Sequence, residues 1–165
     1  MAIFRLAPDK VKPAAISASV VFLACALFFF SPVRLPHKIT LTLASAFIAS
    51  LWLCPWQISM ALLFSALGDY FGSCHNFMAQ MGSFAMAHIW LIIFFAARYH
   101  RTRKNAAKGK RFAFGATFGS IALLAAAFVF IVPHAPEGIL QTGVSIYACL
   151  ICAMLLLALL QRDVY

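Results

Sequence analysis

Residues 65–88 read SALGDYFGSCHNFMAQMGSFAMAH, and both flanks of this stretch are apolar. The segment before it is Met60–Phe64, and the segment after it is Ile89–Phe95. Two apolar segments joined by a short polar turn are typical of a hairpin of two membrane helices. The stretch nevertheless contains an aspartate, Asp69, before the turn. A carboxylic acid inside such a hairpin is costly and therefore unusual.

The composition indicates that the rest of the chain also lies in a membrane. Of its 165 residues, 64% are hydrophobic and only 10% are charged, which leaves too few polar side chains to cover a soluble domain of this length. A membrane helix needs about 20 apolar residues. The expected spans are residues 13–30, 39–53, 56–73, 77–97, 112–132 and 139–160. The sequence therefore predicts an all-α, polytopic transmembrane bundle of six helices, forming a single membrane domain over residues 1–165.

The formal charge of +9 is arranged as membrane topology requires. Of 13 lysines and arginines, three precede the first span, seven lie between the fourth and fifth, and one follows the sixth, whereas two lie between the first and second. The positive-inside rule then predicts that both termini are cytoplasmic. The basic loop is expected to attract anionic lipid head groups, and no nucleic-acid partner is expected. Short connections favour a bacterial inner (plasma) membrane protein.

Asp69 is the only acidic residue inside an expected span. A carboxylate in hydrocarbon is expensive, so an intramembrane acid is by default a functional-site hypothesis. Burial favours the protonated acid, which can donate a proton to a substrate. The alternative is a structural clamp in which the carboxyl group hydrogen-bonds a neighbouring helix. The candidate ligands are too scattered for a metal site, so we expect no metal and no cofactor.

Lys38 is the basic residue whose depth best matches that of Asp69. If the second and third spans form a hairpin about Pro55, the two residues differ in depth by only about 5 Å, at about 1.5 Å per residue. Both are then expected to lie toward the outer leaflet. His88 lies about 13 Å deeper than Asp69 in the next hairpin, too far for direct contact. His88 therefore either hydrogen-bonds a neighbouring helix or belongs to a site in another way.

Two pairs of glycines lie four residues apart in expected spans. They are Gly68 with Gly72 and Gly115 with Gly119. Such pairs let helix backbones approach closely. We expect both pairs to serve packing within the bundle, and dimerisation is the alternative use.

Four sequence elements, in order, resemble the YhhN-like family of membrane proteins, the lysoplasmalogenases. FSALGD over residues 64–69 is similar to the family pattern FSxxGD, and GSFAMAH over residues 82–88 is similar to the segment that follows it. Lys38 opens the second span as a lysine does in the family. Residues 144–154 are similar to the family's VxxYAxxIxxM helix.

The resemblance implies that the substrate is a lysophospholipid, a lysoplasmalogen, whose vinyl ether bond is hydrolysed to a fatty aldehyde and a glycerophospho-alcohol. Acid catalysis suits this bond, and Asp69 is the expected acid. Lys38 is expected either to pair with Asp69 or to bind the substrate phosphate. Besides the substrate, membrane lipids are the expected partners. Further residues expected to line the pocket or to assist catalysis are Ser65, Gly68, His88, Tyr147 and Met154.

The chain departs from the family pattern in three respects. The family bundle has eight helices, and the last two, one of which carries a Ser-Asp pair, are absent from this sequence. Leu91 stands where the family has a tyrosine after the histidine, and Ile39 stands where it has a proline after the lysine. Two alternatives therefore stay open. One is a non-catalytic lipid-binding or transporting membrane protein, and the other is an incomplete fragment of the enzyme.

Overall fold

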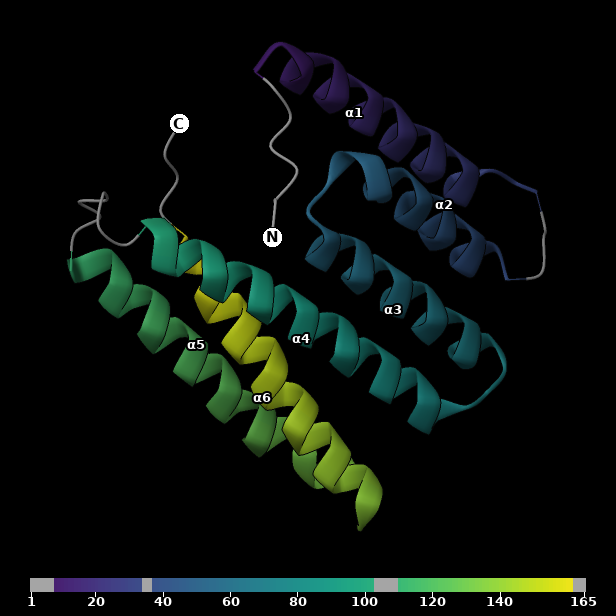
Figure 1. Cartoon of the computed structure of the whole chain (residues 1–165). Coiled ribbons are helices and arrows are strands. Elements are labelled where there is room, and N and C mark those ends of the chain that lie inside the picture. The colour runs from purple at the N-terminus through teal and green to yellow at the C-terminus, as the bar shows by residue number, and fades with distance from the viewer. Residues whose placement is uncertain (1–7, 34–36, 103–109, 162–165) are drawn as a thin grey trace. The chain divides into compact units, whose positions relative to one another are not determined.

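The computed structural model describes residues 8–33, 37–102 and 110–161 (Figure 1). Within these ranges the chain forms six α-helices and no β-strand, so the all-α prediction is confirmed. Each expected span overlaps one helix, and that all six cross the membrane stays a prediction. The helices are α1 (Pro8–Phe30), α2 (Lys38–Leu53), α3 (Trp56–Ser73), α4 (Phe77–Thr102), α5 (Lys110–Phe130) and α6 (Ile139–Leu159). Half of the expected basic loop, residues 103–109, lies outside the described residues.

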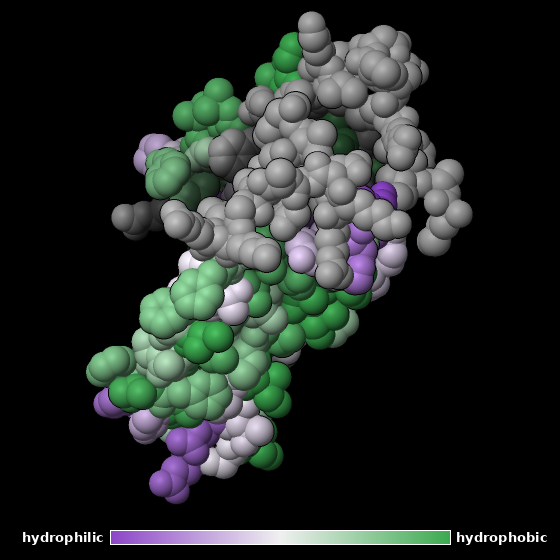
Figure 2. Space-filling model, turned by 90° about the vertical axis from the view of Figure 1, so that its left-hand side faces the viewer, coloured by the Kyte–Doolittle hydropathy of each residue, from purple (hydrophilic) through white to green (hydrophobic). Residues whose placement is uncertain are grey.

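Three of the described helices are long and apolar enough to cross a membrane. They comprise Phe77–Arg101, Ala113–His134 and Ile139–Leu159, and a fourth apolar helix, Lys38–Leu51, is shorter. Large apolar side chains stay exposed on these helices, which in water would be unfavourable. Apolar residues cover most of the coloured surface in Figure 2. Length, composition and exposure therefore agree with a membrane protein.

The chain divides into two compact units, residues 1–87 and 88–165. In the first unit, α1 packs along α2, and α2 packs along α3 (Figure 1). The turn between α2 and α3 is made by Cys54, whose amide donates to the Ser50 carbonyl, and by Pro55. Proline has no amide hydrogen and cannot continue α2, so the chain reverses here. That the chain forms one membrane domain stays a prediction.

Helices α3 and α4 approach each other closely at the first glycine pair. A Cβ atom placed on Gly68 would lie 3.0 Å from ring carbons of Phe84, and one placed on Gly72 would lie 2.6 Å from Nε2 of Gln80. Only the absence of a side chain permits these approaches. The expected packing role of this pair is confirmed.

In the second unit, α5 and α6 pack together through the short 3-10 helix η1 (Val132–His134). The Gln141 side chain donates to the Val132 carbonyl at 3.3 Å and so ties α6 to η1. The glycine pair of α5 behaves differently from that of α3, because no atom among the described residues comes within 4 Å of a Cβ placed on Gly115 or Gly119. The expectation that this pair packs closely is therefore wrong for the described part of the chain.

Candidate functional site

Asp69 and Lys38 line the same polar cavity in the first unit. The cavity has a volume of about 420 Å³ and forms where α2 begins, α3 ends and α4 begins. The two residues meet here, as their matched depths predict. The lining residues are His37, Lys38, Ile39, Thr40, Asp69, Gly72, Ser73 and Gln80.

The Lys38 ammonium is held by the C-terminal end of α1. Its Nζ donates to the Ser31 carbonyl at 2.6 Å and to the Ser31 hydroxyl at 3.2 Å, and it lies 5.5 Å from the centre of the Phe28 ring. The C-terminal end of a helix carries partial negative charge, so a cation is stabilised there. An ammonium group has three protons, and these two bonds leave one for the cavity.

Asp69 is half-buried on α3. Among the residues that the structure describes, no hydrogen bond or ion pair reaches its carboxyl group, because Lys38 donates to Ser31 instead. The sequence left open whether Lys38 pairs with Asp69, and in this structure it does not. The arrangement suits a proton donor.

His37, just before α2, borders the same cavity and was not singled out by the sequence analysis. Its Nδ1 lies 2.6 Å from the Ser73 hydroxyl, and its ring centre lies 5.4 Å from that of Tyr70. The Ser73 hydroxyl in turn donates to the Tyr70 carbonyl at 2.7 Å. These contacts tie the start of α2 to the end of α3 and direct an imidazole to the cavity that contains Asp69.

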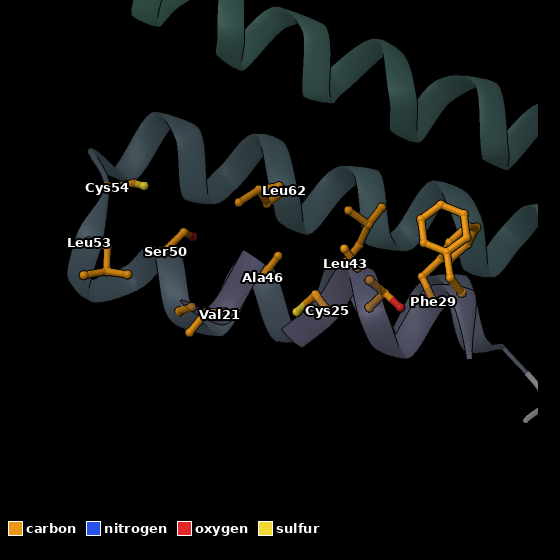
Figure 3. Close-up of a pocket in the computed structure, with 13 residues that line it drawn as sticks. Val21, Cys25, Phe29, Leu43, Ala46, Ser50, Leu53, Cys54 and Leu62 are labelled. Carbon is orange, nitrogen blue, oxygen red and sulfur yellow. The ribbon is translucent and has the colours of Figure 1, made fainter. Parts of the chain in front are cut away.

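A second cavity in the first unit is apolar and lies between α1 and α2 (Figure 3). Its volume is about 430 Å³, and Leu62 contributes from α3. Thr42 lines this cavity, and its hydroxyl donates to the Lys38 carbonyl one helical turn earlier. The apolar cavity and the polar cavity are therefore lined by adjacent turns of α2.

Two predicted site residues meet in the second unit. The His88 and Tyr147 rings lie 5.3 Å apart, edge to face, at 85°. Tyr147 also lines an apolar cavity of about 460 Å³ between α5 and α6. Met154 is half-buried further along α6. The rings of His88 and Tyr147 are thus in contact in the second unit. In the first unit, Asp69 and Lys38 line one cavity without contact.

The two remaining predicted residues lie on α3 near Asp69. Gly68 is buried beneath Phe84, so it serves the packing of α4 rather than the cavity wall. Ser65, one turn before Asp69, is half-buried and does not line the polar cavity. In the described part of the chain, no three His, Cys, Asp or Glu side chains are arranged to hold a metal ion.

Comparison with known proteins identifies one family. A model of the YhhN family matches residues 34–164. The chain belongs to the YhhN family. Comparisons with curated proteins and with solved structures find no match. The YhhN match begins just before α2 and includes both Lys38 and Asp69, whereas α1, whose end holds Lys38, precedes it.

The YhhN motifs lead to Asp69 and Lys38 but not to the rest of the cavity. His37 and Gln80 belong to none of the motif segments, and only their nearness to Lys38 and to the α3–α4 turn could have drawn attention to them. Whether a polar residue at a helix end faces a cavity depends on how the helices are rotated against one another. Hydropathy does not record that rotation.

Proposed function

We propose that this YhhN-family membrane protein hydrolyses the vinyl ether bond of a lysoplasmalogen, with Asp69 as the proton donor. The observation that carries the proposal is the Asp69 carboxyl group, which has no hydrogen bond or ion pair with any described residue and lines the same polar cavity as Lys38. An intramembrane acid is otherwise hard to explain. The family motifs around Asp69 support the same reaction.

Vinyl ether hydrolysis begins with the transfer of a proton to carbon. Protonated Asp69 gives its proton to the alkenyl carbon that is not bonded to oxygen, which leaves an oxocarbenium ion on the neighbouring carbon. The Asp69 carboxylate formed in this step stabilises that cation electrostatically, as carboxylates do in glycoside hydrolysis. Water adds to the cation, and the resulting hemiacetal collapses to a fatty aldehyde and an alcohol.

Lys38 and the apolar cavity suit the two ends of such a substrate. The third proton of the Lys38 ammonium is available for a phosphate oxygen of the head group. The cavity between α1 and α2 offers an apolar wall for the hydrocarbon chain, and Thr42 connects it to the turn that carries Lys38. A lysophospholipid combines these two features. In the proposed setting, a bacterial inner membrane with both termini cytoplasmic, this polar cavity faces the outer leaflet.

The test is release of fatty aldehyde from a lysoplasmalogen by the purified protein in liposomes. We expect activity in the wild-type chain and a loss of at least about 100-fold in Asp69→Asn, which keeps the shape but cannot donate the proton. Glu137→Gln is the matched control, because Glu137 is an exposed acid outside the cavity. Wild-type protein that releases no aldehyde, or Asp69→Asn with full activity, would refute the proposal.

A lipid-binding or lipid-transporting protein without catalysis is the second candidate. The apolar cavity between α1 and α2 favours it, because that cavity needs no chemistry to hold a hydrocarbon chain. The same liposomes decide between the candidates. Lipid that stays bound to both the wild-type protein and Asp69→Asn, with no aldehyde from either, supports the non-catalytic function.

A further inference from the structure

His37 occupies a backbone conformation that is unusual for a residue with a side chain. Its φ is 56° and its ψ is 30°, in the left-handed region, directly before α2. Non-glycine residues reach this region only when the surroundings hold them there, and such residues gather at functional sites. The conformation brings the imidazole to the cavity lined by Asp69.

The hydrogen bonds of His37 determine which ring nitrogen is free. A serine hydroxyl has one proton, and Ser73 donates it to the Tyr70 carbonyl at 2.7 Å. Ser73 must therefore accept from His37, whose Nδ1 lies 2.6 Å away. When Nδ1 carries the proton of a neutral imidazole, Nε2 has a lone pair. His37 is thus held as a base.

Among the described residues, few charged groups lie near the His37 imidazole. Lys38 follows on α2 and donates to Ser31, outside the His37 contacts. Asp69 lines the cavity from α3, and the Tyr70 ring packs against the imidazole from the same helix. From α4, the neutral Gln80 side chain lines the cavity. Asp69 is therefore the one acidic group among the lining residues.

We propose that His37 is the general base that works with Asp69, an inference that rests on the proposed vinyl ether hydrolysis. After Asp69 protonates the alkenyl carbon, Nε2 of His37 takes a proton from the water that adds to the oxocarbenium ion. In the collapse of the hemiacetal, protonated His37 returns its proton to the leaving alcohol oxygen. The Asp69 carboxylate takes the hydroxyl proton of the hemiacetal at the same time. One water is consumed, and both residues return to their starting forms.

His37→Asn is the variant that isolates the base. Asparagine tolerates the left-handed conformation, and its amide can still donate to Ser73, but it has no nitrogen lone pair to accept a proton. We expect a fall in kcat of about 100- to 10,000-fold with little change in KM.

His75→Asn is the matched control. His75 has nearly the same φ, 57°, and is exposed as His37 is, but it lies in the turn after α3 and does not line the cavity. The same substitution there should leave both kcat and KM unchanged. His37→Gly provides an independent readout, because glycine accepts this backbone and added imidazole can enter the space. We expect free imidazole to restore part of its lost aldehyde release.

The outcomes separate this inference from the proposed function. If the wild-type protein is active and Asp69→Asn is not, but His37→Asn keeps the wild-type kcat, His37 is not the base and the function stands. A wild-type protein without aldehyde release overturns the function and, with it, the role of His37. Loss of kcat in His37→Asn together with rescue of His37→Gly by imidazole supports the inference.

Discussion

Replacing Gly68 with alanine should destabilise the protein, although alanine favours helices. The new Cβ would lie 3.0 Å from two ring carbons of Phe84. Carbon atoms in good contact are about 3.5–4.0 Å apart, so α3 and α4 must separate or the ring must turn. Extra volume in a packed interior costs about 1–3 kcal/mol. Alanine recovers about 1 kcal/mol of helix propensity, which leaves a net loss of about 0–2 kcal/mol.

Gly115→Ala is the control for this prediction, because its stability should change in the opposite direction. No described atom lies within 4 Å of a Cβ placed there, so only the gain in helix propensity remains, and the variant should be more stable by up to about 1 kcal/mol. Each of these glycines is the first of a pair spaced four residues apart. From the two estimates, the alanine variants should differ by about 1–3 kcal/mol in the free energy of unfolding.

Unfolding by sodium dodecyl sulfate in mixed micelles, followed by circular dichroism at 222 nm, would measure the difference. The wild-type protein and both alanine variants are compared at one protein concentration and one detergent ratio. If Gly68→Ala is as stable as Gly115→Ala, the α3–α4 contact does not depend on the missing side chain, and the reasoning is wrong. A Gly68→Ala variant that regains stability when Phe84→Leu is added would support the assigned contact.

Two further predictions concern the cavity and its side of the membrane. Lys38→Ala should raise KM about 10- to 100-fold, because a charged hydrogen bond contributes about 1.5–3 kcal/mol, and Ser31→Ala should raise KM less. With an alkenyl glycerol that has no phosphate, neither variant should change KM. An equal rise in KM with that substrate would contradict the phosphate role. In intact cells, a membrane-impermeant maleimide should label the exposed Cys74 in the α3–α4 turn, whereas Cys54 in the α2–α3 turn should react only after permeabilisation. The reverse labelling pattern would refute the orientation.

The helices were readable from the sequence for a simple physical reason, although α1 begins and α4 ends five residues beyond the expected bounds. A helix in hydrocarbon must satisfy its own backbone hydrogen bonds over about 20 apolar residues. The length of an apolar segment in the sequence therefore predicts a span. Pro55 marks the reversal between α2 and α3 because proline cannot continue a helix. Asp69 was equally visible, since an acid within an apolar run is rare.

The matched depth of Lys38 and Asp69 could also be calculated, because a helix advances by a constant rise per residue. Depth alone, however, does not determine contact. Lys38 bonds to Ser31 at the end of α1 rather than to Asp69, although both line one cavity. That choice depends on where α1 packs, which the motifs around Asp69 do not describe.

The sequence by itself determined the six helices, their turns and the position of Asp69, an acid in an apolar segment and therefore a functional-site hypothesis. Only the tertiary structure decided that His37 joins Asp69, that Lys38 is held by Ser31, and that one glycine pair packs while the other stays open. The reason is that lipid, unlike water, is as apolar as the contacts between helices. A membrane helix is apolar toward lipid and toward its neighbours alike, so hydropathy records its length and depth but not the rotation that selects its contacts.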